Sequence, residues 1–293
     1  MRVLDAEAAE FFTACDELGE GPAWHPAKGV LLWVDIIRGR LYSHDIGAGI
    51  TSVCEYGRPV SAALPRVAGG TVVAVDDGLL LLDAGGEVER HIPVEADIVT
   101  NRLGDMGVDP AGRLWLGTLD KDLTAGRGGL YRLSPAGDPV KVIDQTCIAN
   151  GIGWSPDGSL MYFVDSAVGR IDVLDYDVRD GSATGRRPWA SVDHVDGSPD
   201  GLAVDSLGGV WVAIWGGGQV RRYSPDGELD AVLPLPVRNV SSCCFAGPEL
   251  DQLFITTARV EMTERMLRAE PLAGSVFCAS TGFRGLSMPA YAG

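Results

Sequence analysis

A phrase of about a dozen residues recurs along this chain, and its spacing constrains the fold more than any other feature. The phrase consists of a small or apolar pair, a turn, and a strand rich in β-branched and aromatic residues. It reads AWHPAKGVLLWVD at 23–35, GVDPAGRLWLGT at 107–118, GWSPDGSLMYFVD at 153–165 and AVDSLGGVWVAIW at 203–215, with looser copies at 64–78 and 244–257. Pro and Gly in the turns suit the φ angles that tight turns require.

The repeats recur at a nearly constant interval. From Trp24 to Val108 there are 84 residues, or two steps of 42, and the later steps are 46, 50 and 41 residues long. Six copies at this spacing are typical of a propeller with about four strands per blade. We therefore expect an all-β, six-bladed β-propeller with four-stranded blades, formed as a single domain by residues 1–293. A two-sheet sandwich would not explain a period held along the chain.

The chain outside the repeats also suggests structure. Residues near Phe11 to Cys15 precede the first copy, and we expect them to supply an N-terminal strand that closes the ring against the last blade. The segment MTERMLRAE at 262–270 is the one plausible helix.

Composition excludes several classes of protein. The chain has 24 basic and 40 acidic residues, a net charge of −16, and no basic cluster that would bind nucleic acid. No apolar run approaches the roughly 20 residues of a membrane span, and the N-terminus lacks the pattern of a signal peptide. The six cysteines are scattered without a CxxC pair, which is typical of reduced thiols. We expect a cytoplasmic protein, monomeric or weakly dimeric, without a nucleic-acid or membrane partner.

Three oxygen-bearing residues stand before separate copies of the repeat. Glu20, Asn150 and Asp200 are each followed by Gly, and each precedes the repeat's apolar anchor by about four residues. In a propeller the blade starts converge on the axis, so these side chains could meet there. Two carboxylates and an amide form a hard-oxygen donor set for one divalent cation. For any one of these sites, ordinary Asx-Gly or Glu-Gly turn chemistry is the favoured explanation, but it explains three in register less easily.

Two further residues could face the same funnel. Arg102 lies at another blade start and could hold a substrate oxygen, although a surface ion pair with Asp105 or Asp109 is an equal alternative. Asp122 follows the strand that ends near Thr118 and could reach the funnel mouth. Other hydrolytic schemes find little support, because the chain has neither an HExxH segment nor a GxSxG elbow.

The sequence resembles the regucalcin (senescence marker protein), gluconolactonase and luciferin-regenerating enzyme family. The segments that carry the resemblance are LGEGPAW, NRLGDMGVDPAGRLWLGT, CIANGIGWSPDG, SPDGLAVDSLGGVWVA, FAGPELDQLFITTA and PLAGSVF, which span residues 18 to 277 in family order. The chain looks most like the bacterial aldonolactonases. The resemblance implies a six-bladed propeller that opens a lactone at a single metal ion held by Glu20, Asn150 and Asp200. It also implies that Asp200 acts as the acid/base and that Arg102 contacts the substrate.

One segment departs from the family pattern. Family members commonly read Asn-Arg-x-Asn-Asp-Gly, whereas this chain has Gly104 and Met106 at the fourth and sixth positions. Gly104 stands where the family has a substrate-contacting Asn, so we expect that side of the pocket to be roomier and less polar. Asp122 stands where regucalcin itself has a Glu.

The functional expectation is therefore a metal-dependent lactonase acting on a sugar aldonolactone or a related lactone. The cation could be Ca²⁺, Mn²⁺, Zn²⁺, Mg²⁺ or Fe²⁺. A metal-dependent esterase or phosphotriesterase on the same scaffold, and a non-catalytic ligand-binding propeller, stay open as alternatives.

Overall fold

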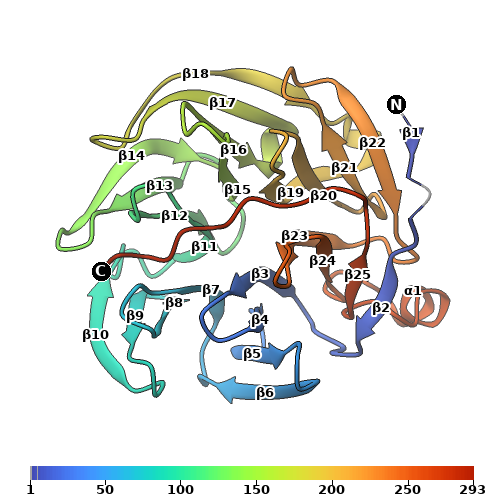
Figure 1. Ribbon diagram of the computed structural model, residues 1–293, viewed down its shortest axis with the longest axis horizontal. Helices are drawn as coiled ribbons and strands as arrows, with labels where there is room; N and C mark the ends of the chain where they lie inside the picture. The colour runs from blue at the N-terminus through green and yellow to red at the C-terminus, as the bar shows by residue number, and fades with distance from the viewer. Residues whose placement is uncertain (1, 5) are drawn as a thin grey trace.

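The computed structural model describes residues 2–4 and 6–293 and shows six sheets arranged as blades around a central axis (Figure 1). From the axis outward, the first three blades are β3 (Gly19–His25), β4 (Val30–Asp35), β5 (Arg40–Asp45) and β6 (Ile50–Glu55); β7 (Val60–Pro65), β8 (Thr71–Val75), β9 (Gly78–Leu82) and β10 (Val88–Pro93); and β11 (Asn101–Val108), β12 (Leu114–Asp120), β13 (Gly128–Leu133) and β14 (Pro139–Thr146). The next two are β15 (Ala149–Trp154), β16 (Leu160–Asp165), β17 (Arg170–Asp177) and β18 (Ser182–Ser191); and β19 (Ser198–Val204), β20 (Val210–Trp215), β21 (Gln219–Tyr223) and β22 (Leu229–Pro234). The predicted six-bladed propeller with four-stranded blades is confirmed.

The last blade is built from both ends of the chain. It contains β23 (Val240–Ala246), β24 (Gln252–Thr257), β25 (Val276–Ala279) and the N-terminal β2 (Ala9–Phe12), which pairs antiparallel with β25. The Phe11 ring packs edge-on against Phe254 of this blade at 4.9 Å and His44 of the first blade at 4.8 Å. The predicted closure by an N-terminal strand is therefore confirmed. The strand ends at Phe12, earlier than expected, where its pairing with β25 stops, and the Ala14 amide then donates to the Phe12 carbonyl.

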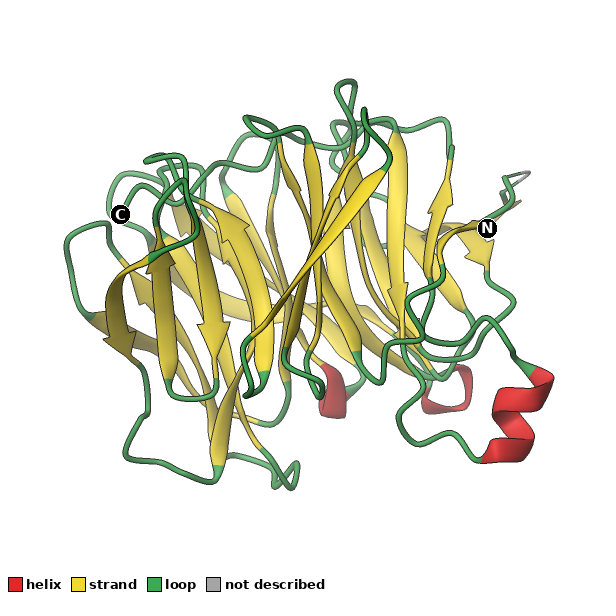
Figure 2. Ribbon diagram, turned by 90° about the horizontal axis from the view of Figure 1, so that it is seen from below, coloured by secondary structure: helices red, strands yellow, loops and turns green. Residues whose placement is uncertain are grey.

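Four further elements of the described chain lie outside the blades' regular four strands. The short β1 (Arg2–Val3) pairs parallel with β22 and was not predicted. Helix α1 (Glu264–Ala269) confirms the predicted helix within 262–270, and two single turns of 3₁₀ helix, η1 (Ser166–Val168) and η2 (His194–Asp196), follow other strands. Figure 2 shows that the helical segments share one face of the disc. Of the described helices, none has the length and apolar character needed to cross a membrane.

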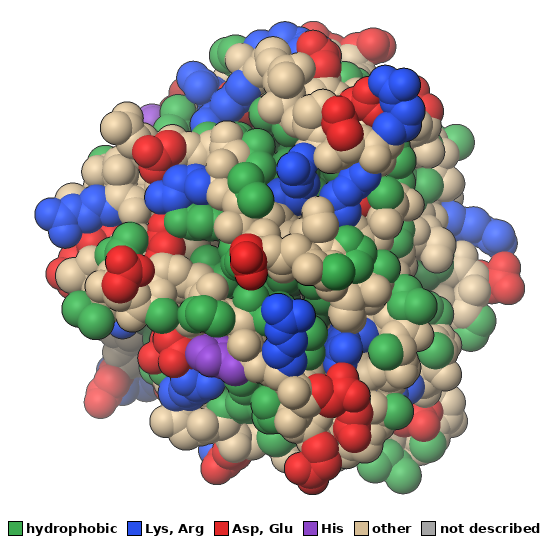
Figure 3. Space-filling model, turned by 90° about the vertical axis from the view of Figure 1, so that its left-hand side faces the viewer, with side chains coloured by type: hydrophobic (Ala, Val, Ile, Leu, Met, Phe, Trp, Pro, Cys, Tyr) green, Lys and Arg blue, Asp and Glu red, His purple; other side chains and the backbone are tan. Residues whose placement is uncertain are grey.

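The burial of each strand follows its distance from the axis. The second strands of the blades lie between neighbouring sheets, are buried almost throughout and carry the bulky residues, including the fully buried Trp33, Trp115 and Trp211. The innermost strands are rich in Gly, Ala and Ser because six of them must converge. At the rim, acidic and basic side chains are interspersed on the face shown in Figure 3.

A register shift interrupts the pairing of every innermost strand with its second strand. The shifts lie between Glu20 and Ala23, Val60 and Ala62, Leu103 and Met106, Ala149 and Ile152, Pro199 and Leu202, and Val240 and Ser242. A β-bulge redirects a side chain while the strand continues. The polar residues predicted at the blade starts therefore lie at bulges within strands, and not in the Asx-Gly turns considered as the alternative.

The C-terminal segment 284–293, called here the C-terminal strap, crosses the face at which the innermost strands end (Figure 1). The beginning of the strap is held by two backbone hydrogen bonds: the Gly285 amide donates to the Leu250 carbonyl, and the Leu286 amide donates to the Val204 carbonyl. The end of the strap is held in the same way: the Tyr291 amide donates to the Pro65 carbonyl, and the Ala292 amide donates to the Gly112 carbonyl. The axis is thus covered at this face and approached through loops at the other.

Candidate metal and substrate site

The structure brings Glu20, Asn150 and Asp200 to equivalent places on β3, β15 and β19, at the face opposite the C-terminal strap. Asn150 Nδ2 donates to Asp200 Oδ1 at 2.5 Å and to Ser166 Oγ, at the start of η1, at 2.8 Å. Glu20 Oε2 accepts the Gly21 amide at 2.9 Å. Three residues separated by 130 and 50 positions in the chain therefore meet at one end of the axis because each occupies the bulge of its own blade.

The glycine that follows each of these residues is required by close packing between blades. A Cβ at Gly151 would lie 2.7 Å from the carbonyl oxygen of Asp200, and one at Gly201 would lie 2.0 Å from Ser242 Oγ. Gly21 has a φ of +52°, and a Cβ there would lie 3.2 Å from Ala62. The Glu-Gly, Asn-Gly and Asp-Gly pairs thus reflect six strands crowded around an axis.

Two buried carboxylates secure the entry to the strands that carry Glu20 and Asn150. Asp35, at the end of β4, accepts the backbone amides of Glu17 at 2.9 Å and Leu18 at 3.3 Å. Asp165, at the end of β16, accepts those of Cys147 at 3.1 Å and Ile148 at 3.0 Å. The second strand of each blade therefore holds the first strand at the height where the site residue projects.

The electrostatics of the site are dominated by like charges removed from water. Burial and, to a lesser extent, the neighbouring Asp105 raise the pKa of Glu20 to about 8, against the opposing effects of the Gly21 hydrogen bond and Arg102. Burial, Glu20 and Asp105 together raise the pKa of Asp200 well above its usual range, and Arg102 opposes this shift. Burial also raises the pKa of Asp105 to about 6. The three carboxyl groups cannot all be ionised cheaply without added positive charge.

The chemistry of these donors fits a divalent cation. A cation would relieve the repulsion between Glu20 and Asp200 and would compete with the protons that their raised pKa values retain. The described residues contain no group of three His, Cys, Asp or Glu side chains clustered as a metal centre. The site therefore depends on Asn150 as its third donor, and in the described chain no hydrogen bond engages Asn150 Oδ1.

Arg102 lies inside the ring and does not form the surface ion pair that was considered as an alternative. Burial lowers the pKa of Arg102, while Glu20 and Asp200 raise it. Across the described residues no carboxylate lies within ion-pair distance of its guanidinium, and Asp109 is paired with Arg113 at 2.9 Å. Arg102 Nη1 donates to the Leu103 carbonyl at 3.0 Å. It is a part-buried cation whose charge acts on the carboxyl groups of Glu20 and Asp200.

Asp122 lies at the same end of the axis but in a different setting. It is exposed in the 121–127 loop between β12 and β13, and its backbone amide donates to Asp120 Oδ1 at 3.0 Å. The loop adjoins the end at which β11 begins, because Asp120 pairs with Asn101. The structure thus places Asp122 in an exposed loop at this end of its blade, and no hydrogen bond among the described residues joins it to Glu20 or Asp200.

The space expected beside Gly104 is filled. A Cβ at this position would lie 2.8 Å from the carbonyl oxygen of Ala149 and 3.0 Å from Leu119 Cδ2. The missing Asn side chain therefore leaves no roomier pocket there, since a leucine of the second strand and a neighbouring strand occupy its volume. Met106 lines a separate cavity towards the C-terminal strap. The expectation of a roomier side is wrong for Gly104.

Two residues of the site were not among the predicted functional residues. Asp105 lies in the β11 bulge, one residue after the position that Glu20, Asn150 and Asp200 occupy in their own strands, which is Gly104 in β11. The residue-Gly pattern therefore did not mark it. Ser166 follows a different strand, and only the fold brings it to Asn150. Register within the repeat places Asp105 at the position of the glycines that follow Glu20, Asn150 and Asp200, so it did not point to Asp105, and nothing local identifies Ser166.

Comparison with known proteins identifies the family. Residues 18–259 match the family model described as the SMP-30/Gluconolactonase/LRE-like region. Human regucalcin is 32% identical over 283 residues, which are 94% of this chain and 95% of the relative. The chain belongs to the SMP-30/gluconolactonase/LRE-like family. Another member, YvrE of Bacillus subtilis (strain 168), is named as a candidate sugar lactone lactonase and is 32% identical over 94% of this chain and 95% of its own length.

Solved structures of family members share the architecture. Regucalcin of Agrobacterium tumefaciens, described as a calcium-binding protein, superposes with a TM-score of 0.95 at 31% identity and covers 99% of both chains. The luciferin-regenerating enzyme superposes with a TM-score of 0.90 at 28% identity, again over 99% of both chains. The family's propeller is therefore retained over essentially the whole chain.

Proposed function

We propose that this protein is a metal-dependent lactonase that opens a small lactone, such as a sugar aldonolactone, at one divalent cation held by Glu20, Asn150 and Asp200. The observation that carries the proposal is the convergence of these three residues at one end of the axis, with the part-buried Arg102 near them. Membership in a family with lactonase-like members, including a relative named for sugar lactones, supports the reaction class.

The proposed ligands are two carboxylates and one amide oxygen, with waters and substrate completing the coordination. Such hard-oxygen donors favour Ca²⁺, Mg²⁺ or Mn²⁺, and Zn²⁺ and Fe²⁺ also accept carboxylate ligands. The calcium-binding description of the Agrobacterium regucalcin is consistent with this set. The bound cation would supply Lewis-acid polarisation of the lactone carbonyl.

The side chains around that position have separate tasks in the hydrolysis. Asp200, whose Oδ1 accepts a hydrogen bond from Asn150, would serve both as a ligand of the cation and as the group that accepts a proton from the attacking water. The same carboxyl returns that proton to the ring oxygen as the ester bond breaks. Arg102 stabilises the negative charge that develops on the carbonyl oxygen or binds a substrate hydroxyl. Asp122, in the exposed loop between β12 and β13, would contact the distal hydroxyls of the substrate.

A cation titration on stripped protein tests the proposal. Ca²⁺, Mn²⁺, Zn²⁺, Mg²⁺ and Fe²⁺ are added separately to wild type, Asp200→Asn and Arg102→Met, and initial rates are measured on gluconolactone, xylonolactone, an aliphatic lactone and paraoxon. We expect cation-dependent lactone opening in wild type and a loss of at least about 100-fold in Asp200→Asn, as typical for general-base removal. Asp157→Asn, in an outer turn, is the matched control and should keep the wild-type rate.

The outcomes separate the alternatives. Activity that survives both cation removal and Asp200→Asn would contradict the mechanism. Turnover of paraoxon without turnover of lactones would indicate the esterase or phosphotriesterase alternative, which Gly104 does not favour because its surroundings are filled. Cation binding without turnover of any substrate would indicate a ligand-binding propeller.

A further inference from the structure

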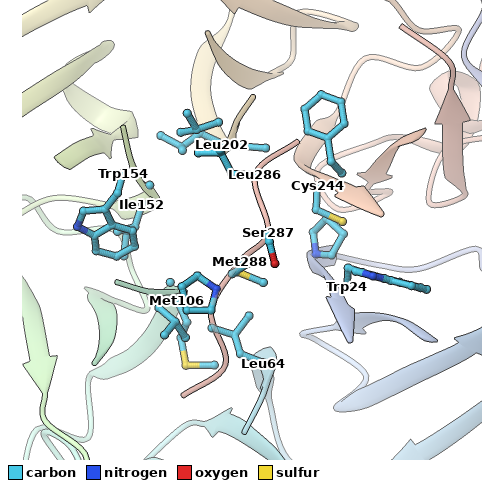
Figure 4. Close-up of a pocket in the computed structure, with 18 of the residues that line it drawn as sticks. Trp24, Leu64, Met106, Ile152, Trp154, Leu202, Cys244, Leu286, Ser287 and Met288 are labelled. Atoms are coloured by element: carbon cyan, nitrogen blue, oxygen red, sulfur yellow. The ribbon is translucent and has the colours of Figure 1, made fainter. Parts of the chain in front are cut away.

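A second cavity lies on the axis between the carboxylates and the C-terminal strap. Its volume is about 260 Å³, and residues from all six innermost strands line it together with Leu286, Ser287, Met288 and Pro289 of the strap. Figure 4 shows side chains from opposite blades converging on this space with the strap passing across it. Glu20, Asn150 and Asp200 are not among its lining residues. The cavity is thus separate from the three proposed cation ligands, although the two sites share the axis and Asp105 borders both.

The lining of this axial cavity is apolar and rich in aromatic rings and sulfur. Trp24, Trp154 and Phe245 contribute rings, and Met106 and Met288 contribute thioethers. Thioethers make favourable contacts with aromatic rings, and their flexible side chains adapt to irregular shapes. Among the described residues of the lining, Asp105 alone belongs to the charged types, and it lies towards the carboxylate end.

This chemistry excludes the substrate proposed for the other site. A sugar lactone carries several hydroxyl groups, and burying each of them without a partner costs free energy. The cavity offers few polar side chains to satisfy them, chiefly the hydroxyls of Ser155, Ser242 and Ser287. A neutral apolar ring would instead replace unfavourable water contacts with dispersion contacts.

The size of the cavity selects among apolar ligands. An apolar protein cavity of about 150 Å³ stays dry and binds benzene. At about 260 Å³ the axial cavity is larger by nearly the volume needed for a second fused ring. Its occupant is therefore expected to be a bicyclic molecule or one of similar bulk.

The strap closes the cavity on one side and, among the described residues, is hydrogen-bonded to the blades only at its two ends. Leu286 and Tyr291 are held by backbone hydrogen bonds to Val204 and Pro65 at either side of the cavity. Between them, in the described structure, no backbone hydrogen bond joins residues 287–290 to the blades. This span can move away from the axis while its two ends stay attached.

We propose that the axial cavity is a second ligand site, which binds one small neutral fused-ring aromatic molecule beneath the strap. The site is independent of the proposed lactonase activity, because its lining excludes Glu20, Asn150 and Asp200. Binding there requires neither a cation nor the general base.

The test uses 2-naphthol as the probe and isothermal titration calorimetry on the full chain. Two variants fill the cavity from different sides: Ile152→Trp from an innermost strand and Met288→Trp from the strap. Val195→Trp, on the exposed η2 turn, is the matched control for adding an indole. We expect saturable binding of one 2-naphthol per chain in wild type and in Val195→Trp, weakened at least tenfold in both filling variants.

Circular dichroism and thermal melting establish whether each variant is folded. If Ile152→Trp does not fold, the affinity of Met288→Trp decides the outcome. Absence of saturable binding to wild type, or equal affinity in wild type and Met288→Trp, would overturn the proposal. Asp200→Asn should bind 2-naphthol with unchanged affinity, and an excess of gluconolactone should not displace the probe from that variant. Displacement would mean that the two sites are one, and would also overturn the proposal.

Discussion

At the scale of single residues, the site is shaped as much by glycines as by the groups that carry its chemistry. The bulge on each innermost strand lets Glu20, Asn150 or Asp200 project towards the axis, but the neighbouring strand then passes so close that the next residue has no room for a side chain. The pair of residues is therefore one structural unit. Its polar member would supply an oxygen ligand to the proposed cation. Its glycine lets the strand that carries this ligand approach the axis.

Gly201→Ala tests this interpretation. The new Cβ would lie 2.0 Å from Ser242 Oγ and 2.8 Å from its Cα, so β19 or β23 must shift, and we expect a loss of about 2 kcal/mol or more in the free energy of unfolding. Gly47→Ala is the control, because a Cβ there meets only Asp45 Oδ1 at 3.4 Å. Urea denaturation of both variants measures the difference. Equal stability of the two variants would contradict the close-packing explanation.

Asp16 makes stability depend on pH. Burial raises its pKa to about 7, with Asp35 adding to the shift, against hydrogen bonds from Tyr42 and Trp33; the side chain is 1% exposed. Because the folded state holds this proton more tightly than the unfolded chain, the contribution of Asp16 to stability falls as pH rises from about 4 to about 7 and is constant above that. Asp16→Asn keeps an acceptor for Trp33 and removes the titration, so its stability relative to wild type should rise over this range, by up to about 4 kcal/mol.

Denaturation of wild type and Asp16→Asn at pH 5 and pH 8 measures this effect. Asp157→Asn serves as the control, because hydrogen bonds from Ser155 and Ser159 lower the pKa of Asp157, so this carboxylate is ionised at both pH values. Removing it should therefore cost the same stability at pH 5 and at pH 8. A constant difference between Asp16→Asn and wild type at both pH values would argue against a buried protonated Asp16.

At the scale of elements, the N-terminal strand β2 joins the two ends of the ring. It hydrogen-bonds to β25, while the Phe12 ring lies 5.4 Å from Trp33 of the first blade and Phe11 contacts Phe254 of the last. Ser275 Oγ donates to Glu10 Oε1 at 2.8 Å. The strand therefore supplies both the fourth strand of one blade and an aromatic contact to its neighbour.

Deleting residues 1–13 should destabilise the propeller by at least about 4 kcal/mol, because two partly buried phenylalanines are lost and the edge of β25 is exposed. Deleting residues 1–4 removes only β1 and should change stability by less than about 1 kcal/mol. Thermal unfolding measures both effects, and size-exclusion chromatography detects association through the exposed edge. A melting temperature of the longer truncation within about 2 °C of wild type would show that β2 does not hold the ring closed.

At the scale of the whole molecule, a cation bound to three blades should behave as a clamp on the ring. Glu20, Asn150 and Asp200 come from the first, fourth and fifth blades, so the ligand set exists only in the closed propeller. Binding to the folded state alone stabilises a protein by about 2.7 kcal/mol when the free cation is at 100 times its Kd. We expect Ca²⁺ or Mn²⁺ to raise the melting temperature of wild type by several degrees.

Asp200→Asn should lose most of this increase, whereas Asp157→Asn should retain it. Differential scanning calorimetry of stripped and cation-loaded protein provides the measurement. An equal rise in melting temperature for wild type and Asp200→Asn would place the stabilising cation elsewhere on the acidic surface.

The repeat determined most of the architecture from sequence alone. A period of about 40–50 residues, with turn residues before β-branched runs, specifies four-stranded blades and their number because each copy must form the same local structure. The same register identified Glu20, Asn150 and Asp200 as residues that would lie at equivalent places. The family resemblance added their proposed chemistry and the proposed role of Arg102.

Only the tertiary structure decided how those equivalent places pack against one another. It placed Asp105 among the acids and Ser166 beside Asn150, filled the space at Gly104 with Leu119, and left an apolar cavity under the C-terminal strap. The reason is that periodicity records contacts within a blade, which recur, whereas the axis is built from contacts between blades. Those depend on side chains from distant and unequal copies of the repeat, so no local pattern encodes them.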